Sequence, residues 1–227
     1  MQPKVESTNV AQPNASVKKR PFRIGIVVNA SNLEDIKYYN AQLKMINKIY
    51  PNAVQLVFLG YKPEEDTLNA LEGLDYEYVR PVSIIHYFKE LKARTIDLLF
   101  IPLIKSLYNA TSENYKKYLE AGIHSIPVIA PNIYPYNKII RDKQNGFIYN
   151  KREDFIPYIK DLLLNHLGLL KLCGTHANED VLTNFNYSKK NIDIISRVFN
   201  LDNEDDNDDD GMDNENQNAI EKPQTPH

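Results

Sequence analysis

Apolar residues gather in short continuous runs, and stretches with helical spacing lie between these runs. The runs cover residues 23–28, 54–59, 76–79, 96–101, 126–130 and 146–149. Buried strands of a parallel sheet have this pattern, because helices cover both faces of such a sheet. The run at 96–101 is the most apolar of the set, so we expect it near the centre of the sheet.

The segments between these runs have the periodicity of amphipathic helices. Ser31 or Asn32 can cap a helix that runs to about Ile49, and Ser83 can cap a second one. Further helices are predicted at 115–122, 153–165, 167–184 and 188–199. Because strands and helices alternate, the fold class is α/β: a single Rossmann-like domain with a doubly wound, mostly parallel six-stranded sheet and right-handed crossovers.

The loops that follow the strands are the places to look for a binding site. Ligands of doubly wound sheets bind beyond the carboxyl ends of the strands, where these loops gather. This rule singles out four loops, at residues 29–32, 60–63, 102–114 and 130–136.

Composition divides the chain into three parts. Residues 1–20 are polar and lack the apolar stretch of a secretory signal, so we expect a flexible leader. Residues 21–200 form the α/β domain. Residues 201–227 hold ten acidic residues against one lysine, whereas residues 1–200 carry 26 Lys and Arg against 20 Asp and Glu. A segment with so few apolar side chains is expected to be disordered, either as a solubilising tail or as a tether on the basic face of its own domain.

Several classes of protein are disfavoured by the composition. No window approaches 18 consecutive apolar residues, which argues against a membrane span. The single cysteine, Cys173, excludes an internal disulfide and fits a reducing compartment, so we expect a cytoplasmic location, or a virion if the protein is viral. No spacing of His, Cys or carboxylates predicts a metal site, and no glycine-rich phosphate loop is present. Basic residues are scattered, which does not favour a nucleic-acid partner.

A set of short motifs carries a resemblance to a known family. The set comprises Pro-Leu at 102–103, Tyr-Asn at 108–109, Lys-x-Leu-Glu at 117–120, Pro-Val at 127–128, Pro-Tyr at 135–136 and Asn-Gly at 145–146. In this order the motifs resemble the C-terminal, nucleotide-sugar-binding domain of GT-B fold glycosyltransferases of family 4 (group 1). The resemblance implies half of a GT-B fold, which binds the nucleoside diphosphate part of a sugar donor.

The resemblance also implies a set of donor-binding residues. Glu120 would accept hydrogen bonds from the ribose diol, which one carboxylate can match with both of its oxygens. The residues expected around the phosphates and the sugar are Lys117, Asn109, Tyr108, Tyr136 and Asn29. The residues themselves also permit plainer roles. Glu120 can be a solvated helix residue, and Lys117 can pair with Glu113 at i,i+4.

The chain departs from the family pattern at the phosphate site. Ser112 stands where the family often has a second glutamate, and the loop after the first strand has no Arg or Lys to grip a diphosphate. The resemblance covers the donor-binding half, about residues 22–199, and does not extend to an acceptor-binding domain, and no catalytic residue can be assigned. Two hypotheses follow. The first is a hexosyl-transferring glycosyltransferase without a further cofactor, which acts with an acceptor-domain protein or as a homo-oligomer. The second is a non-catalytic binding or structural module, for example a virion or assembly component.

Overall fold

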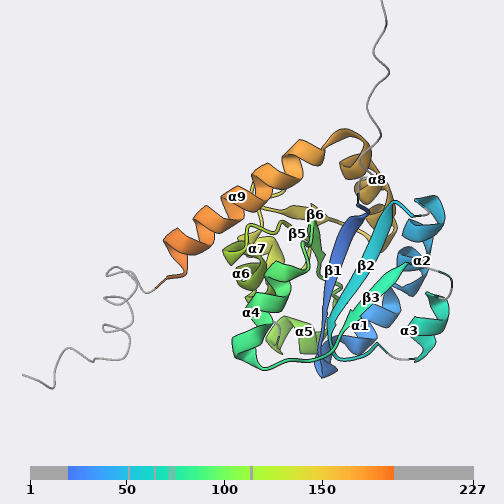
Figure 1. Ribbon diagram of the computed structural model, residues 1–227. Helices are drawn as coiled ribbons and strands as arrows, with labels where there is room; N and C mark the ends of the chain where they lie inside the picture. Colours follow the sequence, from blue (N-terminus) through green and yellow to red (C-terminus); the bar gives the residue numbers. More distant parts are fainter. Residues whose placement is uncertain are drawn as a thin grey trace, which may run out of the picture. The chain divides into compact units, whose positions relative to one another are not determined.

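A single sheet of parallel strands lies at the centre of the protein, as the computed structural model shows (Figure 1). The strands lie in the order β3-β2-β1-β4-β5-β6, and every described pair of neighbours is parallel. Their bounds are β1 Phe22–Val28, β2 Val54–Gly60, β3 Tyr76–Val79, β4 Leu98–Phe100, β5 Val128–Pro131 and β6 Phe147–Tyr149. The predicted six-stranded α/β fold is therefore confirmed, and the apolar run at 96–101 supplies one of the two central strands.

The structure describes residues 20–50, 52–63, 65–71, 73, 75–112 and 115–186. Apart from Arg20, the predicted leader lies outside these residues, as do the acidic tail and the helix predicted at 188–199. Within the described part, the chain through Phe185 belongs to one compact unit.

The helices agree with the predicted segments, except that one predicted helix is divided in two and three short helices were not predicted. They are α1 Leu33–Tyr38, α2 Asn40–Ile49, α3 Glu65–Ala70, α4 Ile84–Ala93, α5 Leu107–Ser112, α6 Lys116–Ile123, α7 Tyr136–Ile139, α8 Phe155–Asn165 and α9 Leu167–Asn184, with short 3-10 turns at Ala30–Asn32 and Arg152–Asp154. The sequence did not predict α3, α5 and α7, and it joined α1 to α2.

Tyr39 separates α1 from α2, where one continuous helix was predicted. Its backbone leaves the helical region, with φ −97° and ψ 6°. Its ring lies in the core against Phe100, and its hydroxyl is 2.9 Å from the hydroxyl of Tyr149 on β6. The break thus accompanies a buried contact between a residue of the first crossover and the last strand.

Each face of the sheet has its own hydrophobic core. Side chains of α1, α2 and α8 cover one face, and those of α4, α6 and α7 cover the other. Strand β1 divides its residues accordingly, because alternate side chains of a strand point to opposite faces. Ile24 and Ile26 enter the first core, and Val27 packs against the second. The alternation along β1 therefore separates the residues of the two cores.

Helix α9 contributes to both cores. Leu170 and Cys173 belong to the first, and Ala177 and Val181 to the second. A close backbone approach accompanies this packing, since a Cβ added at Gly174 would lie 2.1 Å from the carbonyl oxygen of Ser125. Only a glycine permits that approach.

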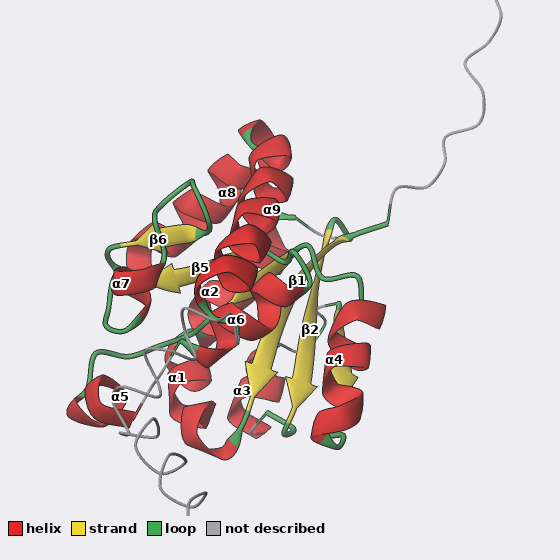
Figure 2. Cartoon of the chain, turned by 90° about the vertical axis from the view of Figure 1, so that its left-hand side faces the viewer, coloured by secondary structure: helices red, strands yellow, loops and turns green. Residues whose placement is uncertain are grey.

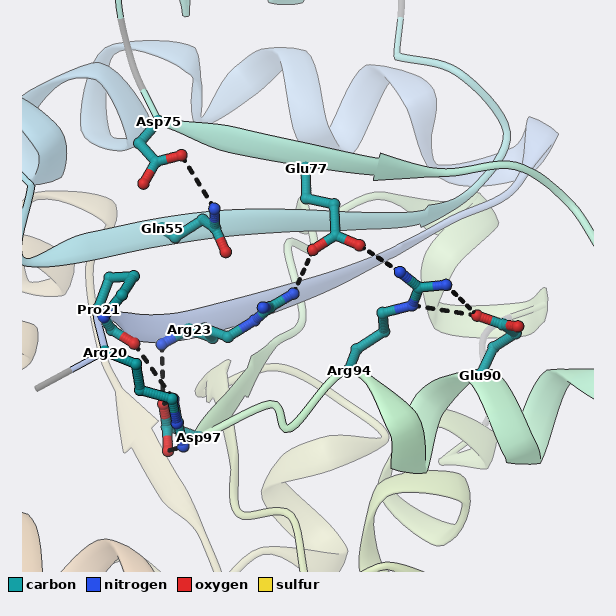
Figure 3. A network of polar contacts seen from close by, with 9 residues as sticks. All are labelled: Arg20, Pro21, Arg23, Gln55, Asp75, Glu77, Glu90, Arg94 and Asp97. Atoms are coloured by element: carbon teal, nitrogen blue, oxygen red, sulfur yellow. Dashed lines mark hydrogen bonds and ion pairs between the residues drawn. The ribbon is translucent and has the colours of Figure 1, made fainter.

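A network of charged side chains fixes the end of α4 to the sheet (Figure 3). Glu77 on β3 forms ion pairs with Arg23 on β1 and with Arg94, which ends α4. Arg94 also pairs with Glu90, one turn earlier on α4, at 2.5 Å. The C-terminal end of α4 is therefore held to β1 and β3 by charge, in addition to the apolar contacts of its buried face.

Candidate functional site

The strand order identifies the position, at the carboxyl edge of the sheet, where doubly wound folds have their ligand-binding crevice. The order reverses between β1 and β4, because the chain winds from β1 to β3 on one side and from β4 to β6 on the other. In doubly wound sheets, ligands bind outside the strand ends at such a reversal. The crevice is bordered by the loop after Val28 and the loop after Phe100. Helix α5 lies toward the end at which the arrowheads of β1 and β2 point (Figure 2).

The loop after β1 is closed by two asparagines. The Asn29 side-chain oxygen accepts hydrogen bonds from the backbone nitrogens of Ser31 and Asn32, both at 3.1 Å. Asn32 makes the reciprocal contact: its side-chain oxygen accepts a hydrogen bond from the backbone nitrogen of Asn29 at 2.9 Å. Asn32 occupies the N-cap position of α1, as predicted, but it makes no side-chain capping bond there. The capping bonds come from Asn29, which caps the 3-10 turn that precedes α1. Asn29 was predicted to bind the donor, but its side-chain oxygen accepts hydrogen bonds from the backbone of its own loop.

A buried carboxylate joins the two sides of the crevice. Asp35 on α1 is 5% exposed, and one of its oxygens accepts from the Ile104 nitrogen at 2.8 Å. The same oxygen accepts from Asn109 Nδ2 at 3.0 Å, and Asn109 Nδ2 also donates to the Ile104 carbonyl at 2.8 Å. Asn109, predicted to bind the donor, is thus part of a tie between α1, the loop after β4 and α5. The sequence analysis did not identify Asp35 as part of the site, and its only signal was an acidic residue in a first helical turn.

The end of β2 approaches β1 closely. Gly60 has a φ of +118°, and a Cβ added there would lie 2.2 Å from the Val28 carbonyl oxygen. The Tyr61 nitrogen donates to that same oxygen at 2.9 Å, and the Tyr78 hydroxyl donates to the Gly60 carbonyl at 3.1 Å. A glycine is therefore required where the predicted loop 60–63 begins.

Glu120 lies on α6, and its side chain contacts a residue of α4. Its side chain is 9% exposed, and its Oε2 accepts a hydrogen bond from the Tyr87 hydroxyl at 3.0 Å. Its Oε1 lies 3.6 Å from Lys116 Nζ, one turn earlier on α6. The plainer interpretation of Glu120, a solvated helix residue, is therefore wrong: the carboxylate is buried and held by groups on two helices. Tyr87 was missed because it shares its helical spacing with the apolar residues of α4.

Burial raises the pKa of the Tyr87 hydroxyl above its ordinary value, and the charge and the hydrogen-bond acceptance of Glu120 raise it further. The phenol therefore stays protonated in the folded protein and acts as a donor toward Glu120.

The remaining predicted residues differ in exposure. Lys117 is buried on α6, at 8% exposure, and its predicted partner Glu113 lies outside the described residues. Tyr108 on α5 is 58% exposed, whereas Tyr136 is fully buried in the second core. The structure thus presents Tyr108 to solvent and makes the side chain of Tyr136 part of the core.

A second hollow lies at the opposite edge of the sheet. It has a volume of about 850 Å³, and its lining includes Phe22, Val54 and Asp97, which stand at or next to the amino ends of their strands. Asp97 there forms two hydrogen bonds with Arg20, at 2.6 and 2.7 Å. The topology favours the carboxyl edge over this hollow as the ligand site.

Among the described residues, no group of three or more His, Cys, Asp or Glu side chains is arranged to hold a metal ion. Within the same part of the chain, no helix is both long and apolar enough to cross a bilayer.

The fold is similar to solved structures of glycosyltransferases. One is the C-terminal domain of LpcC, a group 1 family glycosyl transferase from Francisella tularensis, with 16% identity and a TM-score of 0.54 over 74% of this chain and 87% of that domain. TarM from S. aureus gives 18% identity and a TM-score of 0.63 over 82% of this chain. HepE from Anabaena, solved with UDP-glucose, gives 14% identity and a TM-score of 0.60 over 80% of this chain.

At these identities the likeness establishes the fold, which is that of the C-terminal domain of GT-B glycosyltransferases, as the sequence resemblance implies. The chain spans 36% of the length of TarM and 49% of that of HepE. No protein-family model matches the sequence, and no curated protein matches it either.

Proposed function

We propose that this protein binds a nucleoside diphosphate sugar at the carboxyl edge of its sheet and serves as the donor half of a glycosyltransferase. The proposal rests on the fold, on the Lys-x-Leu-Glu motif at 117–120 and on the solved relative that carries UDP-glucose. The observation that carries it is Glu120, a carboxylate that is 7% exposed and held by a neutral hydroxyl from another helix.

Glu120 has the acceptors that a ribose diol needs. A carboxylate has about four lone-pair positions on its two oxygens, and Glu120 accepts a hydrogen bond from Tyr87 and forms an ion pair with Lys116 at 3.6 Å. Two vicinal hydroxyls can therefore donate to the same group. Because the carboxylate is already fixed, it loses little freedom when the diol binds, which favours affinity.

The contribution of this half to catalysis would be electrostatic. Lys117 on α6, with the exposed Lys105 and Lys116, would stabilise the charge that develops on the leaving diphosphate. The acceptor-binding surface would come from a partner protein or from another copy of the chain, because a GT-B active site lies between two domains.

The test is calorimetric titration of the purified chain with uridine, guanosine and adenosine diphosphates and their glucose conjugates. We expect one of them to bind with a Kd of about 1 mM or tighter, and Glu120→Gln to weaken that binding about tenfold or more, since it removes charge-assisted hydrogen bonds. Glu153→Gln is the matched control, because Glu153 has a 68% exposed side chain.

A second function is favoured by a separate observation. The side-chain oxygen of Asn29 and the amide nitrogen of Asn109 are both engaged inside the protein, and the Tyr136 ring is buried. Because these side chains are occupied by contacts within the protein, the arrangement fits a non-catalytic binding or structural module that keeps the fold. The test applies to a chain that has a normal unfolding transition. If no nucleotide at millimolar concentration then gives a heat of binding, the result would support the non-catalytic module and overturn the proposal of a donor half.

A further inference from the structure

Two helices that are far apart in the sequence meet at the carboxylate of Glu120. Tyr87 lies on α4 and Glu120 on α6, 33 residues later, and the Tyr87 hydroxyl donates to Glu120 Oε2 at 3.0 Å. A neighbouring contact links the same two helices, since the Phe88 ring lies 6.0 Å from the His124 ring. The Tyr87 hydroxyl therefore reaches Glu120 across an established helix contact.

The Tyr87 ring is held from several sides. It packs against the second core and meets Phe88 edge to face, with ring centroids 5.5 Å apart. Helix α4 itself is anchored at its far end by the ion pairs of Arg94 with Glu77 and Glu90, which Figure 3 shows. A fixed ring on a fixed helix places its hydroxyl at one point, so the hydrogen bond orients the carboxylate.

We propose that Tyr87 is a positioning residue for ribose recognition, which holds the Glu120 carboxylate in the orientation that accepts the 2′- and 3′-hydroxyls of the donor nucleotide. This inference rests on the proposed function, because it assigns a role to Tyr87 only if Glu120 binds ribose. Tyr87 lies outside the motifs that carry the resemblance. The inference assigns the specificity for a diol to the pair of Tyr87 and Glu120.

The geometry explains why a tyrosine and not a charged residue holds Glu120. The phenol satisfies one oxygen without neutralising the carboxylate, which remains a strong acceptor for a neutral diol. Lys116, the other neighbour of Glu120, has a side chain that is 65% exposed. An exposed lysine restrains a partner weakly, because its side chain is flexible and solvated. The half-buried tyrosine, packed against the second core, is therefore the group that defines the position of the carboxylate.

The experiment compares two ligands and three variants by calorimetry. The ligands are the nucleoside diphosphate that binds the wild type and its 2′,3′-dideoxy analogue, which has no diol to recognise. Tyr87→Phe is expected to weaken the first ligand about threefold to tenfold, the range for one hydrogen bond, and to change the Kd of the second by less than about twofold. In a Glu120→Gln background the effect of Tyr87→Phe is expected to shrink to less than about twofold, which is the sign of coupling.

Tyr118→Phe is the matched control. Its hydroxyl also donates to a carboxylate, that of Asp180 on α9, at 2.6 Å, and Tyr118 lies two residues from Glu120 on α6. The variant removes this bond and the one that Asn145 Nδ2 donates to the same hydroxyl at 2.9 Å, but it does not touch the Glu120 contact, so it should leave both Kd values unchanged. Should Tyr87→Phe fail to fold, Tyr87→Met also lacks the hydroxyl and fills the space with a flexible apolar side chain.

The outcomes separate the two proposals. If the wild type binds no nucleotide, the proposed function fails and the role of Tyr87 fails with it. If the wild type binds and Glu120→Gln weakens binding while Tyr87→Phe does not, the proposed function stands and the positioning role is wrong. Equal weakening of both ligands by Tyr87→Phe would also overturn it, because it would mark a general loss of structure.

Discussion

Asn109 Nδ2 donates to the Asp35 carboxylate at 3.0 Å, across 74 residues of sequence. The contact joins helix α1 to helix α5, and the same Asp35 oxygen accepts from Ile104 in the loop that follows β4, so the carboxylate links the two borders of the crevice where the strand order reverses. A buried acceptor thus fixes the distance between the loops in which a ligand would lie.

We expect Asp35→Asn to lower the free energy of unfolding by about 1–3 kcal/mol. The variant keeps an oxygen but loses the charge that strengthens the bonds from Ile104 and Asn109. Chemical denaturation followed by circular dichroism measures the loss. The exposed neighbour Glu34, changed to Gln, should alter stability by less than about 0.5 kcal/mol. Equal effects in the two variants would contradict a role of the Asp35 contact.

Two glycines of the same helix should respond in opposite ways to alanine. A Cβ at Gly174 would lie 2.1 Å from the Ser125 carbonyl oxygen, so Gly174→Ala must displace α9 and should cost about 1–3 kcal/mol or more. At Gly168 a Cβ meets no atom within 4 Å, so Gly168→Ala should leave stability unchanged or raise it by up to about 1 kcal/mol. Thermal unfolding of both variants tests the pair, and a stable Gly174→Ala protein would refute the close approach of α9.

The Cys173 thiol should be unreactive in the folded protein. It is fully buried in the first core, and burial is the main cause that raises its pKa to about 11, so very little thiolate forms at neutral pH. Ellman's reagent should therefore release no colour from the native chain, and one equivalent from the chain unfolded in guanidinium chloride, because the sequence has one cysteine. Prompt reaction under native conditions would show that the region around α9 opens readily.

His124 should make the protein less stable in mild acid. Burial, and secondarily the charge of Lys92, lower the pKa of its imidazole from the ordinary 6.5. The unfolded chain then binds more protons than the folded chain between the two pKa values. Stability is therefore fully present above pH 6.5 and is lost as the pH falls toward the folded-state pKa.

The measurement is the free energy of unfolding as a function of pH for the wild type and for His124→Gln. The difference between the two proteins isolates His124, because both share the remaining titratable groups. The variant should have the flatter dependence below pH 6.5. Parallel curves would mean that His124 titrates alike in both states.

Local patterns in the sequence were sufficient for the fold. Each predicted run became a strand, and the run at 96–101, which is apolar at nearly every position, supplied a central strand. The apolar period of α8 indicated its buried side, at Phe155, Ile159 and Leu162. The short helices escaped prediction because six residues or fewer show too little of a period, and α5 lies in a polar segment.

The sequence by itself therefore determined the strands, the longer helices and their order along the chain, because each depends on residues close together in the chain. Only the tertiary structure decided which polar groups meet: Asp35 with Asn109, and Tyr87 with Glu120. Those pairings depend on which helix lies beside which, and on a few tenths of an ångström in how they pack. An acidic residue in a helix has the same local pattern whether it faces water or a buried hydroxyl, so the packing of the helices alone made that distinction.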